Sequence, residues 1–224
     1  NADVDKVQTV ERATTLAEGS VKVHTVEHVI SALTGMGVDN ALIEMDANEP
    51  PIGDGSSRPF VEMIRKAGIV AQPSPRRVWE IRETIHQETA DGTLITIVPC
   101  KTFKISVTNV GPDGRFTQYF SSEITPEKYE KEIAPARTFG FKQQVEQLLA
   151  AGLIKGGALD NALVCDGDAW VNPPLRFADE PVRHKLLDLL GDLALAGLPQ
   201  AQVFAFRGSH GLHTALAAAL ASLP

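Results

Sequence analysis

The stretch that decides the fold is EPVRHKLLDLLGDLALA, residues 180–196, a strongly apolar segment whose pattern predicts a helix. Its polar exceptions include His184, Asp188 and Asp192, which follow one another at intervals of four residues. Side chains four residues apart share one face of a helix. We therefore expect an imidazole and two carboxylates along one face, in apolar surroundings where a buried carboxylate needs a partner.

The flanking sequence predicts an α+β fold. Before this helix, four β-rich runs separated by turn signals predict an antiparallel meander over residues 78–88, 93–98, 103–110 and 115–121. After it, a buried strand at 201–206 precedes a final helix at 210–223. Further helices are expected at 24–35, 59–66 and 140–151, and further strands at 41–45 and 161–166. Strands cluster before helices instead of alternating with them, which is typical of the α+β class.

The segment QPSP at residues 72–75 has the composition of a linker. It predicts a first α+β domain over residues 1–72 and a second over residues 76–224. In each half a histidine, His28 or His184, stands near the start of a helix that leads through glycines to a strand. Either the halves are pseudo-duplicates or the helix patterns arose independently. If they pack as pseudo-equivalents, the two histidines face each other at the domain interface, where pockets preferentially form.

Composition excludes several classes of protein. The 224 residues include 21 basic and 28 acidic side chains, a net charge of -7 without the basic excess of a nucleic-acid binder. No run approaches the roughly 20 apolar residues of a membrane-spanning helix, and the polar start does not resemble a signal peptide. The two cysteines, Cys100 and Cys165, form no disulfide framework and fit a reducing compartment. We therefore expect a cytoplasmic protein with no nucleic-acid partner and no membrane-spanning segment.

A metal site is one interpretation of the histidines. His184 and Asp188 can bind one zinc ion from a single helix face, and His28 can supply a third ligand, which leaves an open position for water. Glu27 stands beside His28, near enough to take a proton from a bound water. The alternatives are a simple His–Asp hydrogen bond and a surface carboxylate beside a capping histidine.

Two further segments carry chemistry. His210 lies between a buried strand and a helix start, where a glycine-containing turn can present an imidazole to a cleft as a proton donor, or where it caps the helix. The stretch ARTFGF, residues 136–141, combines the cation Arg137, the hydroxyl of Thr138 and the aromatic Phe139. These groups suit oxyanion stabilisation and stacking on a sugar ring, although the phenylalanines of this stretch can also be core residues.

Several of these segments together resemble a known family, the zinc-dependent UDP-3-O-acyl-N-acetylglucosamine deacetylases of lipid A biosynthesis. The matching segments occur in the family's order and cover most of the chain. They are TVEH (residues 25–28), PIGDGS (51–56), APARTFGF (134–141), LRF (175–177) with Glu180, RHKLLDLLGD (183–192) and SH (209–210). Family members begin with strands upstream of the position that corresponds to Asn1, so the resemblance implies that part of the first domain's sheet is missing from this sequence.

The resemblance implies a role for each matching residue. Zinc would be bound by His28, His184 and Asp188, with Glu27 as the general base. His210 would act as general acid or electrostatic partner, oriented by Asp192, and Thr138 would stabilise the oxyanion. The expected substrate contacts are Phe139, Lys185, Arg137, Arg207, Leu148 and Leu153.

The family's architecture is two packed α+β layers, pseudo-duplicated halves with the helices sandwiched between sheets. A β-α-β insert, expected in this chain at about residues 141–172, forms an apolar passage for the acyl chain, to which Leu148 and Leu153 would contribute. The resemblance further implies the substrate, a UDP-linked acylated glucosamine that loses acetate. Fe²⁺ is a possible replacement for Zn²⁺ because a His₂-carboxylate set accepts both. Fusion to or association with a fatty-acid dehydratase occurs in some bacteria.

Two rival hypotheses stay open at this point. Under the first, the chain is a zinc hydrolase of another acylated sugar nucleotide. Under the second, it is a non-enzymatic module that binds lipid or a partner protein. In the second case the His–Asp pair on the predicted helix is purely structural.

Overall fold

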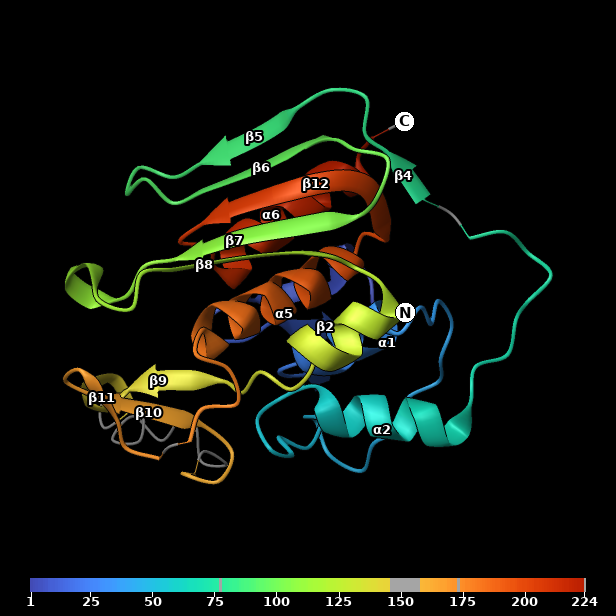
Figure 1. The fold of residues 1–224 in the computed structure, drawn as a ribbon. Helices are drawn as coiled ribbons and strands as arrows, with labels where there is room; N and C mark the ends of the chain where they lie inside the picture. The colour runs from blue at the N-terminus through green and yellow to red at the C-terminus, as the bar shows by residue number, and fades with distance from the viewer. Residues whose placement is uncertain (77, 146–157, 173, 224) are drawn as a thin grey trace.

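The chain folds around one large β-sheet (Figure 1). A computed structural model describes residues 1–76, 78–145, 158–172 and 174–223. The sheet has six strands in the order β5-β6-β12-β7-β8, and β4 pairs with another part of β12. The strands are β4 (Val78–Glu80), β5 (Ile85–Glu88), β6 (Leu94–Pro99), β7 (Lys104–Asn109), β8 (Gln118–Glu123) and β12 (Leu198–Phe206).

The predicted antiparallel meander is wrong in one respect, because β12 separates β6 from β7. It runs antiparallel to β6 and parallel to β7, and with nine residues it is the longest strand of this sheet. Its alternate residues Ala201, Val203 and Ala205 are buried, which suits a central strand. The four residues between β6 and β7 are enough to cross the roughly 10 Å between next-nearest strands. The loop length is therefore compatible with both strand orders.

Helices cover one face of this sheet. The long helix α5 (Glu180–Ala194) packs against β7 and β8, and α6 (His210–Ala221) packs against α5 and β6 (Figure 1). On the side of α5 away from the sheet lies α1 (Glu27–Gly35). The α+β class is therefore confirmed. Most of the large, fully buried aliphatic side chains come from the sheet and these helices: Ile95, Ile97, Ile105, Leu186, Leu187, Leu189, Leu190, Leu193 and Leu216.

A glycine sets the closeness of α1 and α5. A Cβ added at Gly191 on α5 would lie 2.2 Å from the backbone oxygen of Glu27, the first residue of α1. Real Cβ atoms essentially never approach another atom so closely. Glycine at position 191 thus allows the backbone of α1 to rest directly on α5.

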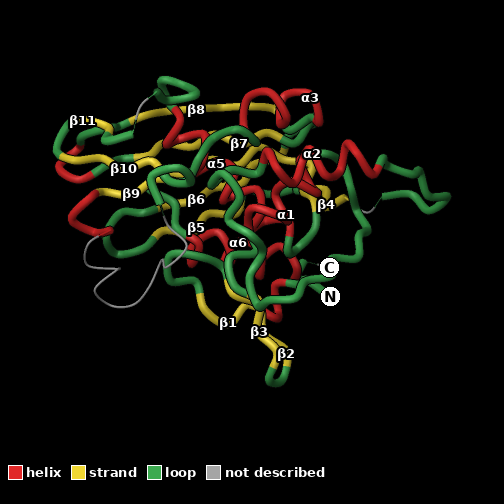
Figure 2. Tube along the Cα trace, turned by 90° about the horizontal axis from the view of Figure 1, so that it is seen from below, coloured by secondary structure: helices red, strands yellow, loops and turns green. Residues whose placement is uncertain are grey.

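A second, smaller sheet near the N-terminus has no counterpart in the sequence-based prediction. It consists of β1 (Val7–Thr9), β2 (Thr15–Glu18) and β3 (Val21–Val23), all antiparallel, and Figure 2 shows it projecting away from the large sheet. The strands are short and the β1–β2 register is irregular, so the alternation of apolar and polar residues is too brief to detect. Leu16 on β2 packs with Val26 and Leu195.

The strand expected at residues 41–45 is absent. This segment is described by the structure and belongs to none of its sheets, and Leu42 is 87% exposed. A strand needs a partner for its backbone groups, and none of the described strands lies beside this segment. The following helix, α2 (Arg58–Ala67), agrees with the predicted one.

A third sheet forms beside the N-terminal end of α5 (Figure 1). In it β9 (Phe139–Phe141) runs parallel to β10 (Leu163–Asp166), which pairs with β11 (Ala169–Trp170). Parallel neighbours need a crossover connection, as a β-α-β insert has. The first strand begins slightly before the predicted insert boundary, and Leu148 and Leu153 lie outside the described residues.

The connecting segments contain short helical turns. These are η1 (Val4–Lys6), η2 (Pro112–Gly114), α3 (Pro126–Lys128) and the π-helical turn η3 (Tyr129–Ile133). Tyr129 is fully buried and its ring lies against Gly35, at the end of α1. Among the described residues, no helix combines the length and apolarity that crossing a bilayer requires.

The contact at Gly191 can be tested by stability. We expect Gly191→Ala to lower the free energy of unfolding by about 3 kcal/mol, because the added methyl overlaps the α1 backbone. Gly211→Ala is the matched control on α6, where a Cβ would meet its nearest neighbour at an ordinary 3.5 Å. That variant should stay within about 1 kcal/mol of the parent or be more stable. Equal urea midpoints for the two variants would contradict the close-packing argument.

Candidate metal centre

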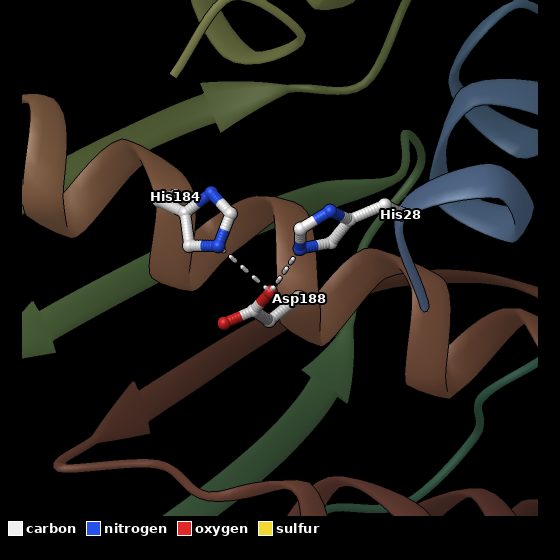
Figure 3. Close-up of side chains that lie close together, drawn as sticks. All are labelled: His28, His184 and Asp188. Atoms are coloured by element: carbon white, nitrogen blue, oxygen red, sulfur yellow. Dashed lines mark ion pairs between the residues drawn. The ribbon is translucent and has the colours of Figure 1, made fainter. Parts of the chain in front are cut away.

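Three predicted metal ligands converge between α1 and α5. His28 comes from the first turn of α1, whereas His184 and Asp188 lie one turn apart on α5 (Figure 3). Nε2 of His184 is 3.3 Å from Oδ1 of Asp188, and Nε2 of His28 is 3.6 Å from the same oxygen. The imidazole rings are perpendicular, with centroids 4.9 Å apart. One potential ligand atom from each residue therefore lies within 4.8 Å of the other two.

Hydrogen bonding prepares His184 for a cation. Its Nδ1 donates to the backbone oxygen of Ala136 at 3.0 Å, which leaves the lone pair on Nε2 facing Asp188. Burial lowers the pKa of His184 to about 4, against the attraction of Asp188, so this imidazole is neutral at pH 7. A neutral ring with its outer nitrogen held by a carbonyl is the usual state of a metal-ligating histidine.

The other two ligands, His28 and Asp188, shift each other's pKa in opposite directions. Burial lowers the pKa of His28, but its hydrogen bond to Asp188 and the charge of Glu27 outweigh burial and raise it. Burial acts to raise the pKa of Asp188, yet His184, Lys185 and His28 hold it well below its ordinary value. A cation bound here would compete with a proton for the imidazole of His28.

The spacing of these atoms fits a tetrahedral ion. Ligands about 2.1 Å from a tetrahedral centre are about 3.4 Å apart, close to the two measured separations of 3.3 and 3.6 Å. Two histidines and one carboxylate make three protein ligands, the number found in catalytic zinc sites with one open position. The residues present therefore fit a divalent cation.

A second buried cluster surrounds Asp192, one turn further along α5. Its carboxylate accepts hydrogen bonds from Nδ1 of His210 at 2.8 Å and from Nδ1 of His213 at 2.9 Å. The hydroxyl of Thr14 donates to its other oxygen at 2.5 Å. His210 and Asp192 were predicted from the sequence, whereas His213 and Thr14 were missed. The sequence offers one indication that His213 belongs to this cluster: it follows His210 by three residues, which places both on the same helix face.

Glu27 lies between the two clusters. Its side chain is buried, and Oε2 accepts a hydrogen bond from the backbone N–H of Thr14 at 3.0 Å. Burial raises the pKa of Glu27, and the charges of His210 and His28 partly offset this. Thr14 thus joins Glu27 to Asp192, through its backbone on one side and its hydroxyl on the other.

Several predicted substrate-binding residues lie next to the metal ligands. The Phe139 ring centroid is 6.5 Å from that of His184, and the ammonium of Lys185 is 5.5 Å from the Phe139 centroid. Lys185 also contacts Asp188 at 3.2 Å. Thr138, half-buried, is held by a backbone hydrogen bond to Gly55 at 2.8 Å.

Two predicted arginines have other partners in the structure. Arg137 forms an ion pair with the buried Glu180 at 2.9 Å and also donates to the backbone oxygen of Pro174. Arg207 is exposed and donates to the backbone oxygen of Asp91 at 3.2 Å. Arg137 therefore ties the start of β9 to α5, and its role toward substrate stays a prediction, as does that of Arg207.

Comparison with known proteins identifies the family. The model of the UDP-3-O-acyl N-acetylglycosamine deacetylase family matches residues 1–222. The chain belongs to this family. Proteins named UDP-3-O-acyl-N-acetylglucosamine deacetylase are similar to it: that of Trichormus variabilis is 46% identical over 99% of this chain and 81% of its own length. The Thermosynechococcus vestitus protein is 45% identical (98% and 77%), and the Chlamydia felis protein 42% (92% and 74%). The resemblance stated from the sequence is confirmed.

Metal content tests the His28–His184–Asp188 centre of this deacetylase-family chain. We expect the protein purified without chelators to hold about one equivalent of a divalent metal, and His184→Ala to lose most of it because one of three ligands is gone. His86→Ala, on the exposed strand β5, is the matched control and should retain the metal. Elemental analysis gives the stoichiometry. Full metal content in His184→Ala would show that the metal binds elsewhere, for example at the Asp192 cluster.

Proposed function

We propose that this chain hydrolyses the acetamide of UDP-3-O-(3-hydroxyacyl)-N-acetylglucosamine, an early committed step of lipid A biosynthesis, and releases acetate and the free amine. The observation that carries the proposal is the convergence of His28, His184 and Asp188 beside the buried Glu27, in a chain of the deacetylase family. The names of the related proteins state the same substrate class. The proposed location of the reaction is the cytoplasm.

The metal would be held by His28, His184 and Asp188. A divalent cation with an open position supplies a Lewis acid for the amide carbonyl and makes water a stronger acid at neutral pH. Zinc is the proposed ion, and ferrous iron is the alternative because the same ligand set suits both. Lys185, with its ammonium 3.2 Å from Asp188, adds a positive charge at the edge of this centre.

Glu27 is the proposed general base. Its carboxylate takes a proton from the attacking water, and the hydrogen bond from the Thr14 N–H fixes its orientation. Because burial raises the pKa of Glu27, its carboxylate is a stronger base than an exposed glutamate. The charges of His210 and His28 act in the opposite direction and favour the ionised carboxylate.

His210 is the proposed general acid. Burial lowers the pKa of His210, but the charge and hydrogen bond of Asp192 outweigh it and raise the pKa to about 9. The imidazole is therefore cationic at pH 7, offsets negative charge on the substrate oxygen, and donates its proton to the departing nitrogen. Asp192 orients it, and the hydroxyl of Thr138 is the proposed further donor to the oxyanion.

Substrate binding is proposed to involve residues around this centre. Phe139 offers a half-buried ring for stacking on glucosamine, Lys185 supplies a cation 5.5 Å from the centre of that ring, and Arg137 and Arg207 are candidates for the nucleotide part. Leu148 and Leu153, outside the described residues, are the proposed contacts of the acyl chain. We further propose the division into domains at residues 1–72 and 76–224, and association with a fatty-acid dehydratase as a possible partnership.

The assignment of Glu27 predicts a separation of chemistry from metal binding. Glu27→Gln should lower kcat by about 10²- to 10⁴-fold, the usual effect of removing a general base, while the metal content stays at the parent value. Steady-state kinetics and elemental analysis of the same sample provide both numbers. A variant with parental kcat would refute the role of Glu27, and a variant without metal would make it a ligand instead.

The proposed substrate predicts a dependence on the acyl chain. UDP-N-acetylglucosamine without the 3-O-acyl group should show kcat/KM lower by at least about 10³-fold, since the apolar contacts of a long chain contribute several kcal/mol to binding. Acetate release from the acylated and unacylated compounds is the measurement. Comparable rates would favour a hydrolase of a different sugar nucleotide, and stoichiometric lipid binding without any turnover would favour the non-enzymatic module.

A further inference from the structure

Two histidines donate hydrogen bonds to the same carboxylate oxygen of Asp192. Nδ1 of His210 and Nδ1 of His213 lie 2.8 and 2.9 Å from Oδ2, and the Thr14 hydroxyl lies 2.5 Å from Oδ1. All of these side chains are buried, and Asp192 has no solvent exposure. Only one of the two histidines has a part in the chemistry described above.

The protonation of this cluster follows from its geometry. An ionised carboxylate can only accept hydrogen bonds, so both Nδ1 atoms must carry hydrogen. Burial lowers the pKa of His213 and outweighs the attraction of Asp192, so His213 is neutral. Its Nε2 then has no proton, whereas His210 beside it is cationic. His213 therefore contributes a fixed neutral donor to the carboxylate that orients the cationic one.

We propose that His213 is a positioning residue for His210: it acts through Asp192, fixing the direction of the carboxylate and sharing its negative charge. The inference rests on the proposed role of His210 as general acid. His213 does not need to touch substrate or metal for this role. Nothing in the resemblance to the deacetylase family assigned a function to this position.

The sharing of the Asp192 charge predicts the sign of a change in the pKa of His210. Asp192 and Asp188 on α5 and Glu27 on α1 act on His210 with negative charge, and Asp192 also carries the hydrogen bond. On Asp192 itself, His210 and His213 are the groups that act through both charge and hydrogen bonds. A donor from His213 stabilises the carboxylate and so weakens its hold on the His210 proton. Loss of that donor should make His210 harder to deprotonate.

The opposite edge of the His213 ring supports the loop before His210. A Cβ added at Gly208 would lie 2.5 Å from Nε2 of His213, so the backbone between β12 and α6 rests against this edge. The neighbouring Arg207 has a left-handed φ of 55°. His213 is therefore wedged between the Asp192 carboxylate and the Gly208 backbone, one turn along α6 from His210.

Substitutions at position 213 separate hydrogen bonding from packing. The amide nitrogen of asparagine can occupy the place of Nδ1, whereas that of glutamine extends toward the place of Nε2. We expect His213→Ala and His213→Gln to lower kcat about 10-fold with little change in KM, since general acid catalysis is impaired but not removed. The alkaline limb of the pH–rate profile should move upward by about 0.5 pH unit. His213→Asn should instead keep kcat and the alkaline limb close to their parental values.

A pair of variants at Gly208 supplies an independent test. Gly208→Ala should mimic His213→Ala, because the new methyl group displaces the ring from Asp192. Combining it with His213→Asn should recover activity, since the shorter side chain leaves room for the methyl group. Folding is checked by the urea midpoint of each variant. Residues in contact need not have additive effects on stability, so a recovery of activity in the double variant supports the role of His213 only where it exceeds any recovery of the urea midpoint.

NMR titration of the histidine rings gives a readout independent of turnover. The pKa of His210 should rise in His213→Ala and return in His213→Asn. Unchanged His210 titration and unchanged pH–rate profiles in His213→Ala and His213→Gln would overturn the role of His213. Parental activity in His210→Ala would instead refute His210 as the acid, and the titration would still report whether His213 acts on Asp192.

Discussion

The site depends on how closely α1 approaches α5. With no side chain at Gly191, the backbone oxygen of Glu27 can rest on the long helix, and the next residue, His28, then faces the groups one turn away on α5. Any side chain at position 191 would push the two helices apart, and ligand sets tolerate displacements of only a few tenths of an ångström. The packing of two helices and the geometry of the candidate metal centre are therefore one and the same constraint.

Burial of charge is balanced in a repeating way along α5. Asp188 and Asp192 are one turn apart, and each faces two imidazoles: His28 and His184 around the first, His210 and His213 around the second. An unpaired carboxylate in such surroundings would cost several kcal/mol. The two clusters differ in protonation, because burial keeps His184 neutral, whereas Asp192 stabilises the cationic form of His210. One cluster is thus suited to a cation and the other to a proton, with Glu27 between them.

The sequence predicted the parts of this site that lie on one element. Spacing along α5 placed His184, Asp188 and Asp192 on a common face. His28, Glu27 and His210 were candidates from their local sequence, and the resemblance joined them to the residues of α5 as one site. The contribution of Thr14 could not be predicted, because a threonine in an irregular segment has no pattern of its own, and its hydroxyl bonds a partner 178 residues away. His213 was visible as a neighbour of His210 by helical spacing, but its direction toward Asp192 depends on how α6 packs.

The fold, like the site, combines features that local sequence predicts with features that depend on distant parts of the chain. Helices α2, α5 and α6 and most strands of the large sheet follow from local periodicity, whereas strand order requires knowledge of distant pairings. The position of β12 between β6 and β7 is one such case. The expected strand at 41–45 is another, since its apolar residues fit a strand but the described residues offer it no neighbour. Local sequence gives the conformation a segment prefers, and the tertiary environment decides whether it is realised.

The central position of β12 has a consequence for biosynthesis. During translation, the antiparallel pairs β5–β6 and β7–β8 emerge from the ribosome long before residue 198, each with an edge that has no partner. Unpaired strand edges can pair prematurely, and the sheet reaches its final order only if these two edges stay apart until the last strand arrives. The two hairpins can be joined into one sheet only after the ribosome releases β12, which follows α5 in the chain.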